Sequence, residues 1–221
     1  MNIRSKKAFH NVTFEDKKPI TLPFNMLIAG SAGSGKSNIV MNLVKLMDNA
    51  FDKIYFYTES KNRTLYNYLE MVIPDKDLLE VHEGLDHLNS IDIDNHYFGQ
   101  TLIIFDGLEH EKDQTKIINL FMRSSILGCS IVCLTQKYWS VSTIIKENLD
   151  YLILKSISKT QEVKSILRDG SLDVNKEELL KMYQFCISGD NLTFLMIDFN
   201  AKEEHQFRLN FLQVLDINYF R

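Results

Sequence analysis

The segment Gly30–Ser37 constrains the fold of this chain more than any other part of its sequence. It reads Gly-Ser-Ala-Gly-Ser-Gly-Lys-Ser and fits the pattern G-x-x-x-x-G-K-[ST] at every fixed position. A short apolar run, Phe24–Ala29, precedes it, and apolar residues recur with helical spacing after it. A strand, a glycine-rich loop and a helix in this order are the setting in which backbone N–H groups at a helix N-terminus bind phosphate. The sequence therefore predicts a site for a nucleoside triphosphate.

Each part of this loop has an expected role. Its glycines let consecutive N–H groups turn inward and form an anion-binding nest. Lys36 is expected to reach the β- and γ-phosphates of ATP, and the Ser37 hydroxyl to complete the shell of a Mg²⁺ ion. The residues predicted to bind the nucleotide are Gly30, Ser31, Ala32, Gly33, Ser34, Gly35, Lys36, Ser37 and Asn38.

The rest of the pattern predicts an α/β fold of three layers. With 221 residues, 45% of them apolar, the chain can bury the core of one such domain. We expect an N-terminal arm over residues 1–19, a single domain over 20–221 and no membrane span. Apolar strands alternating with helices indicate a mainly parallel sheet covered on both faces. The expected strands are Phe24–Ala29, Lys53–Thr58, Thr101–Phe105, Ser130–Thr135 and Tyr151–Lys155, and the expected helices are Lys36–Asn49, Asn62–Met71, Gln114–Leu127 and Val141–Asn148.

The pattern is weaker elsewhere. An extra strand is expected near Leu78–His82, and the final third predicts a helix pair, Gln161–Arg168 and Lys176–Cys186, before a strand at Leu192–Asp198. The last apolar segment, Phe207–Leu215, is compatible with an edge strand or a helix, and the sequence does not decide between them.

Two further strands end in polar side chains that fit a nucleotide site. Thr101–Asp106 is an apolar strand that closes on a carboxylate, as in a Walker B motif, and Asp106 is expected to help hold Mg²⁺ with Ser37. Gln136 follows the apolar strand Ser130–Thr135 and could sense the γ-phosphate, or simply cap a turn. A polar residue after a strand inserted between the two Walker strands is typical of RecA/ASCE-like P-loop NTPases.

The acid that activates the attacking water is the least certain part of the predicted site. A Glu usually follows the Walker B Asp, but this chain has Gly107 there. Glu109, two residues further on, is the first candidate, and Glu59, after the second strand, is the other. Each could equally be an ordinary loop acid.

Charge leaves contact with DNA open. The net charge of −4 argues against a protein coated with nucleic acid over its whole surface. Basic residues nevertheless outnumber acidic ones in the first eighteen residues and between Lys137 and Arg168. A phosphate-binding track and ordinary solvated helix faces explain these excesses about equally well.

Three segments, Leu22–Ser37, Thr101–Asp106 and above all Ser130–Leu154, resemble the genome-packaging ATPases of double-stranded DNA viruses. These are the poxvirus, giant-virus and virophage type within the FtsK–HerA group. The most diagnostic part is the strand ending at Gln136, followed by Tyr138 and Trp139 and by a helix that runs into Asn148. The resemblance implies a homo-oligomeric ring that hydrolyses ATP with Mg²⁺ to drive double-stranded DNA into a preformed capsid. It also implies docking on a capsid vertex or portal component, and a place in the virus factory of the host cytoplasm or with the virion.

The chain departs from the family pattern in three places. Gly107 stands where a second acid is usual, and Ser125-Ile126 where an Arg-His pair is common, although Arg123 lies two residues earlier. Lys146 stands where the family often has Arg. An arginine finger from a neighbouring subunit would stabilise charge on the γ-phosphate. Arg123 is the first candidate for it, and Lys146 is the second because an ammonium lacks the bidentate fork of a guanidinium.

Two other functions fit the same loop. A nucleotide or nucleoside kinase suits the size of the chain, but the strand-end Gln136 and the lack of an arginine-rich lid argue against it. A nucleotide-gated binding module with little turnover is kept open by Gly107. A GTPase is disfavoured because Thr135–Tyr138 contains no Asp to read guanine.

Overall fold

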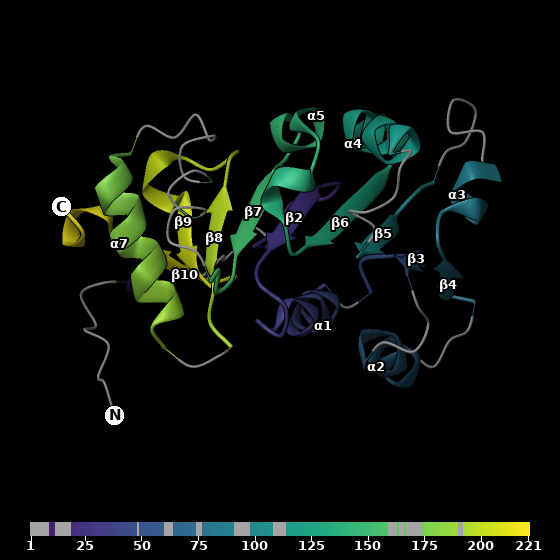
Figure 1. Ribbon diagram of the computed structural model, residues 1–221, viewed down its shortest axis with the longest axis horizontal. Helices are drawn as coiled ribbons and strands as arrows, with labels where there is room; N and C mark the ends of the chain where they lie inside the picture. The colour runs from purple at the N-terminus through teal and green to yellow at the C-terminus, as the bar shows by residue number, and fades with distance from the viewer. Residues whose placement is uncertain are drawn as a thin grey trace.

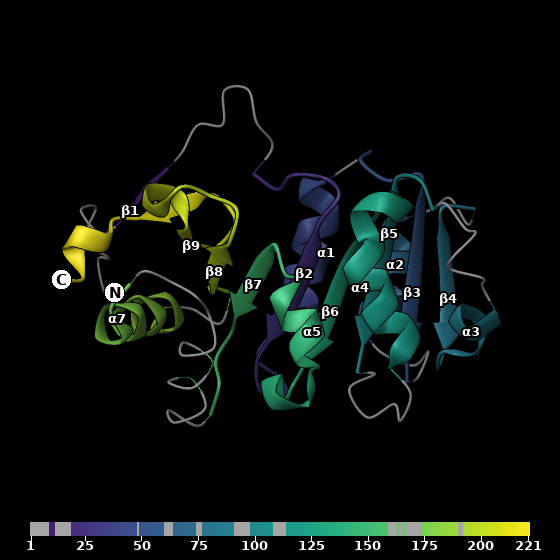
Figure 2. The ribbon, with the colours of Figure 1, turned by 90° about the horizontal axis from the view of Figure 1, so that it is seen from above.

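A ten-stranded sheet runs through the whole molecule, with helices on both faces (Figures 1 and 2). The computed structural model describes residues 9–11, 19–47, 49–59, 64–73, 77–90, 98–107, 114–158, 163, 166, 174–189 and 192–221. The strand order is β1-β10-β9-β8-β7-β2-β6-β5-β3-β4. The strands are β1 (Phe9–Asn11), β2 (Asn25–Ala29), β3 (Lys53–Thr58), β4 (Leu79–Glu83), β5 (Thr101–Asp106), β6 (Cys129–Thr135), β7 (Tyr151–Leu154), β8 (Leu195–Asp198), β9 (Phe207–Leu209) and β10 (Gln213–Leu215).

The sheet has a parallel half and an antiparallel half that meet at β7. Strands β7, β2, β6, β5, β3 and β4 are parallel to one another. Strands β8, β9, β10 and β1 continue the sheet in antiparallel fashion beyond β7. The expected α/β class with a mainly parallel central sheet is therefore confirmed, and the antiparallel half extends it.

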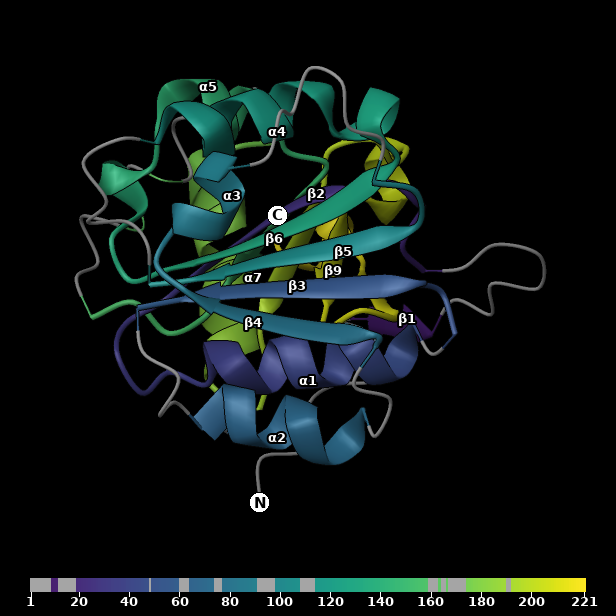
Figure 3. The ribbon, with the colours of Figure 1, turned by 90° about the vertical axis from the view of Figure 1, so that its right-hand side faces the viewer.

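The helices form the two outer layers. In Figure 3, α1 (Lys36–Leu46) and α2 (Thr64–Val72) lie below the sheet, while α3 (Asp86–Ser90), α4 (Thr115–Leu127) and α5 (Thr143–Glu147) lie above it. Helix α7 (Lys176–Ile187) lies beside the antiparallel half. Short 3₁₀ turns occur at η2 (Tyr138–Ser140), η3 (Glu203–His205) and η4 (Ile217–Tyr219). No helix in the described part of the chain is long and apolar enough to cross a bilayer.

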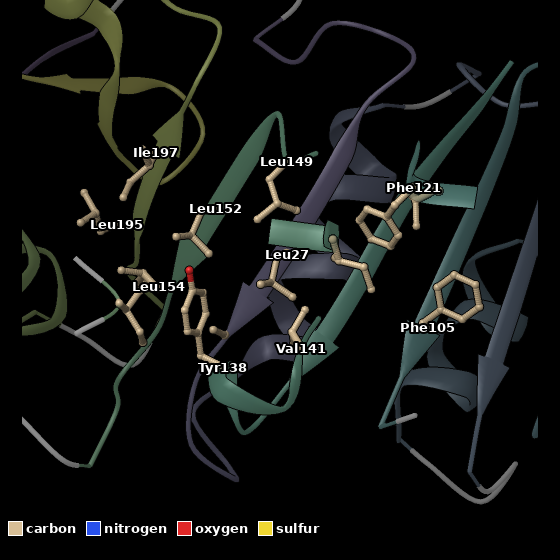
Figure 4. Packing of buried hydrophobic residues seen from close by; sticks show 14 of the residues in the cluster. Leu27, Phe105, Phe121, Tyr138, Val141, Leu149, Leu152, Leu154, Leu195 and Ile197 are labelled. Carbon is tan, nitrogen blue, oxygen red and sulfur yellow. The ribbon is translucent and has the colours of Figure 1, made fainter. Parts of the chain in front are cut away.

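Two hydrophobic cores lie on opposite faces of the sheet because successive strand residues point to opposite sides. In β2, Leu27 belongs to the core beneath α4 and α5, whereas Met26 and Ile28 belong to the core beneath α1 and α2. Figure 4 shows the first core, where Leu27 and Phe105 from the sheet meet side chains from α4, from the segments that flank α5, and from β7 and β8. The central strands are thus apolar on both faces, as their sequences predict.

Most expected elements are confirmed, and their ends shift for local reasons. The predicted strand Lys53–Thr58 is matched at both ends. The helix predicted to reach Asn49 stops at Leu46, and Asn49 itself has a left-handed backbone with φ 57°. The last helix before β7 begins at Thr143 because the Ser142 side chain accepts a hydrogen bond from Ile144 N–H and caps it.

The C-terminal third resolves the segment that the sequence left open. Phe207–Leu215 forms neither a helix nor a single strand, but the antiparallel pair β9 and β10, with Asn210 at φ 58° between them. Strand β10 in turn pairs with β1. The predicted helix Lys176–Cys186 and the predicted strands near Leu78–His82 and Leu192–Asp198 are confirmed with shifted ends. Most of the predicted helix Gln161–Arg168 lies outside the described residues.

Candidate nucleotide-binding site

The predicted site residues come together at one edge of the parallel half. Strands β2, β3, β5 and β6 run in the same direction, so their carboxyl ends share this edge. The chain leaves them at Gly30, Glu59, Gly107 and Gln136 respectively. Ligands of open α/β sheets bind outside the carboxyl ends of the strands. The topology therefore brings together residues from four separate parts of the sequence.

The loop after β2 needs glycine for two different reasons. Gly35, the N-cap of α1, has φ 93° and Gly33 has φ 69°, a left-handed backbone that side chains disfavour. Gly30 is required by space, because a Cβ there would lie 2.6 Å from the Cβ of Lys155 and 2.7 Å from Ser34 Oγ. The loop is thus both curled by its backbone and packed closely against the end of β7.

Lys36 is held over the loop at the start of α1. Its ammonium donates hydrogen bonds to the carbonyl oxygens of Gly30 at 2.7 Å and Ser31 at 3.0 Å. Ser37 is half-buried and Asn38 is exposed in the same helical turn. The positive end of the helix dipole and the ammonium therefore face the same space, which favours an anion there.

Asp106 ends the buried strand β5 and is only 6% exposed. In the sheet it pairs with Thr58 of β3 on one side and Leu134 of β6 on the other. A carboxylate and a serine hydroxyl at this edge are hard oxygen donors of the kind that Mg²⁺ takes. The donor chemistry of Ser37 and Asp106 thus fits a magnesium ion bound together with phosphate.

The chain turns sharply after Asp106. Gly107 has φ 80°, so its backbone occupies a conformation that a glutamate would adopt only under strain. Among the described residues, Glu59 is the predicted candidate for water activation at this edge, and it is exposed directly after β3. Glu109, the first candidate, lies outside the described residues.

Gln136 lies beside the start of the phosphate-binding loop. Strand β6 runs between β2 and β5, and Gly30 N–H donates to the carbonyl oxygen of Thr135 at 3.2 Å. The Thr135 hydroxyl accepts from Lys137 N–H at 3.0 Å, which shapes the turn around Gln136. Gln136 is exposed. The inserted strand that the sequence predicted is therefore in place between the two Walker strands.

The two finger candidates lie on the helices α4 and α5. Helix α4 starts near the nucleotide edge and ends one residue before β6, so Arg123, in its second half, lies toward the opposite edge. Lys146 lies on α5, and its ammonium is 4.3 Å from the ring centre of Tyr138 and 5.4 Å from that of Trp139. Arg123 would therefore have to act on the nucleotide of a neighbouring copy, whereas Lys146 lies beside two rings that closely follow Gln136.

A cavity of about 270 Å³ opens beside the loop and includes residues that sequence reasoning missed. Lys155 is buried there and donates to the carbonyl oxygen of Thr193 at 2.9 Å, so it cannot belong to an exposed DNA-binding track. Ser31 Oγ lies 2.8 Å from Ser158 Oγ and accepts from Ser158 N–H. The parallel direction of β7 could have placed residues 155–158 at this edge, but no local signal marks the rest of the lining. The cavity is lined by Ser31, Ala32, Gly33, Ser34, Lys155, Ser156, Ser158, Ile187 and Thr193.

The strand order is β7-β2-β6-β5-β3, the phosphate-binding loop follows β2, and Asp106 ends β5. Together these features define a P-loop NTPase of the RecA/ASCE-like class. A family model for the poxvirus A32 protein matches residues 11–198, and the chain belongs to this family. The expected relation to the poxvirus packaging proteins is thereby confirmed at the level of the family.

Individual relatives are distant in sequence. The DNA packaging protein OPG160 of monkeypox virus is 19% identical over 185 residues, which cover 79% of this chain and 61% of that protein. The chain thus spans about three-fifths of the length of this curated relative.

Solved structures share the fold over most of the chain. The genome packaging NTPase B204 of Sulfolobus turreted icosahedral virus 2, in complex with ATP-gammaS, has a TM-score of 0.61 at 15% identity, covering 88% of this chain and 98% of that one. EssC (ATPases 2 and 3) from Geobacillus thermodenitrificans has a TM-score of 0.56 at 16% identity, covering 88% of this chain and 40% of that one. The core architecture is therefore that of known ATPases.

Proposed function

We propose that this protein is an ATPase that moves double-stranded viral DNA into a preformed capsid. The single observation that supports ATP binding and hydrolysis is the position of β6 between β2 and β5. Gln136, which follows β6, therefore leaves the sheet between the phosphate-binding loop after β2 and Asp106 at the end of β5. Membership of the poxvirus A32 family and the name of the monkeypox relative, a DNA packaging protein, support the DNA part.

In this proposal the loop and α1 bind the phosphates of ATP. Lys36 exchanges its bonds to Gly30 and Ser31 for bonds to phosphate oxygens, and the curled backbone contributes further N–H donors. Ser37 and Asp106 would hold Mg²⁺, which neutralises charge on the phosphates when bound. The serine and threonine hydroxyls of the neighbouring cavity suit the sugar of the nucleotide.

Hydrolysis also requires a base and a positive charge at the γ-phosphate. Glu59, or Glu109 from the loop after Gly107, would take the proton of the attacking water. Gln136 would orient that water or report the γ-phosphate. The positive charge would come from Arg123 or Lys146 of a neighbouring copy; Arg123 lies in the half of α4 toward the opposite edge of its own chain. A homo-oligomeric ring is therefore part of the proposal.

The biological setting rests on the family relation alone. A capsid vertex or portal component would anchor the ring, and the protein would act in the virus factory of the host cytoplasm, with the virion as a second location. Of the basic residues between Lys137 and Arg168, Lys137 is exposed and available to DNA, whereas Lys155 is buried.

The test is ATP hydrolysis by the purified protein with and without duplex DNA. We expect hydrolysis that DNA stimulates and that Lys36→Ala lowers by on the order of 10²–10³-fold. Lys45→Ala is the matched control, because Lys45 is an exposed lysine in the last turn of the same helix. Wild-type hydrolysis indifferent to DNA, in a protein that stays monomeric with nucleotide, would contradict the proposal.

A binding module with little turnover is the second candidate, and Gly107 favours it. A glycine with a left-handed backbone stands at the position after the Walker B residue, where most such ATPases carry an acid. Tight ATP binding without phosphate release, in the presence of DNA, would select this candidate. Phosphoryl transfer to a nucleoside monophosphate would instead select a kinase.

A further inference from the structure

Three side chains that commonly ligate metals meet at the far edge of the sheet. Glu80 and His82 lie two residues apart on β4, so they share one face, and His87 lies on α3, which is drawn above β4 in Figure 1. One ligand atom from each lies within 4.8 Å of the others, and all three residues are half-buried. Strand β4 is separated from the loop strand β2 by β6, β5 and β3. The cluster is thus distinct from the nucleotide site.

A second layer of contacts orients His87. Its Nδ1 lies 2.9 Å from the hydroxyl of Tyr57, which projects from β3 beside β4. When His87 Nδ1–H donates to the phenol oxygen, Nε2 carries the lone pair and becomes the ligating atom. Metal-bound histidines generally have such a partner at their other nitrogen.

Glu80 supplies negative charge to the same point. Its Oε1 lies 2.6 Å from Lys53 Nζ, and its Oε2 lies 3.4 Å from His82 Nε2. The ion pair with Lys53 holds the Glu80 carboxylate in place on this face of β4. One oxygen therefore faces the lysine and the other faces the histidine pair.

We propose that Glu80, His82 and His87 bind a divalent transition-metal ion, with Zn²⁺ as the best fit. Two histidines and one carboxylate with an open fourth position form a common zinc donor set. Tetrahedral zinc places its ligand atoms about 3.3 Å apart, and Glu80 Oε2 and His82 Nε2 are already 3.4 Å apart.

One movement is needed to complete the site. The rings of His82 and His87 stack in parallel, with centroids 3.8 Å apart and planes at 5°. Their lone pairs then run side by side, so one ring must turn for both nitrogens to meet at one ion. His87 is the ring expected to turn, with its Nδ1 staying on the Tyr57 hydroxyl, because helix α3 has only five residues while His82 is fixed within the sheet. The ion would tie α3 to the edge strand β4.

The experiment is a titration of chelator-treated, nucleotide-free full-length protein with Co²⁺, followed by its visible absorption, and then displacement by Zn²⁺. The background carries Asp106→Asn so that the nucleotide site contributes no metal. We expect one ion per chain in a four-coordinate spectrum. His82→Ala and His87→Ala should abolish it, and Tyr57→Phe should weaken binding about 10-fold.

Controls separate a lost ligand from a lost fold. Glu80→Gln keeps the size of the side chain and should still weaken binding at least 10-fold. His205→Ala, on η3 in the antiparallel half, should bind like the parent. Each variant is checked by circular dichroism and by its melting temperature without metal. Binding that survives in the His82→Ala/His87→Ala double variant, or no binding by the folded parent at millimolar metal, would overturn the proposal and leave a stacked histidine pair only.

Discussion

Asp106 at the end of β5 is paired in the sheet with Thr58 at the end of β3. Glu59 therefore leaves β3 at the same level at which Gly107 leaves β5. A glutamate usually expected on the Walker B strand is thus available from the neighbouring strand. This makes Glu59 the best-placed acid among the described residues of this edge.

Replacing this acid should separate the two candidates for water activation. If Glu59 is the base, Glu59→Gln should lower ATP turnover by about 10²–10⁴-fold with little change in ATP binding. Glu83→Gln is the matched control, since Glu83 ends the adjacent strand β4 opposite Thr58. Loss of turnover in Glu109→Gln, with Glu59→Gln active, would instead place the base in the loop after Gly107. Steady-state phosphate release measures both.

The loop glycines should differ in what an alanine does. At Gly30 the added Cβ meets Lys155 Cβ at 2.6 Å and Ser34 Oγ at 2.7 Å, so β7 or the loop must move. We expect Gly30→Ala to cost about 1–3 kcal/mol in free energy of unfolding and to weaken ATP binding. At Gly33 nothing lies within 4 Å, but φ is 69°, so Gly33→Ala should cost about 1 kcal/mol. Urea unfolding and nucleotide titration compare the two, and equal effects would contradict the role of space at Gly30.

A finger supplied by a neighbour can be detected by mixing inactive variants. If Arg123 acts between subunits, Arg123→Ala should lower turnover by about 10³–10⁵-fold. Mixing it with Lys36→Ala should restore activity. In the mixture, the intact phosphate-binding loop of an Arg123→Ala subunit can lie next to the intact Arg123 of a Lys36→Ala subunit. A mixture of Lys36→Ala and Asp106→Asn is the control, since both changes affect one site. If Arg123→Ala stays active, the same mixing with Lys146→Ala tests the second candidate.

Breaking the buried ion pair in the antiparallel half should change how the free energy of unfolding depends on pH. Arg208 Nη2 lies 2.5 Å from Asp198 Oδ2, and both side chains are nearly inaccessible. Burial raises the pKa of Asp198, and the charge of Arg208 opposes this rise. Arg208→Met should therefore cost about 3–5 kcal/mol at neutral pH.

The direction in which the stability cost of Arg208→Met changes with pH follows from the protonation of Asp198. Without Arg208 the pKa of Asp198 in the folded state rises further above its value in the unfolded chain, so the folded state binds the proton more tightly. The deficit should therefore be largest above the folded pKa and shrink as the pH falls through it. Urea unfolding across the acidic and neutral range checks this, with Arg221→Met at the exposed C-terminal residue as the control. A deficit that grows toward acid would contradict it.

The parallel half could be predicted from the sequence because its signals are local. Apolar runs such as Lys53–Thr58 are bounded by polar residues, and the loop at Gly30–Ser37 fixes the direction of the chain. In the antiparallel half the sequence predicts the strand at Leu192–Asp198 but leaves Phe207–Leu215 open, because β9 and β10 have only three residues each and β10 pairs with β1, about two hundred residues earlier. Pairing over such distances leaves no periodic trace in a short segment.

The site divides in the same way. Lys36, Asp106 and Gln136 follow strands that the sequence identifies, so their meeting at one edge could be predicted. Thr193, which lines the cavity beside the loop, could not be predicted, because no local pattern in the sequence brings it next to Lys155. The cluster at Glu80, His82 and His87 depends on where the short helix α3 returns over β4, and no pattern in the sequence encodes that return.

The continuity of the sheet limits where this protein can bend. Strand β7 is hydrogen-bonded to β2 on one side and to β8 on the other, so an unbroken ladder joins the nucleotide edge to the antiparallel strands. The N–H of Thr21, just before β2, also donates to the hydroxyl of Tyr151 in β7. Bending between the two halves of the sheet would therefore break hydrogen bonds on one side of β7. In the proposed ring, mechanical work drawn from ATP would then be done at the interfaces between neighbouring copies.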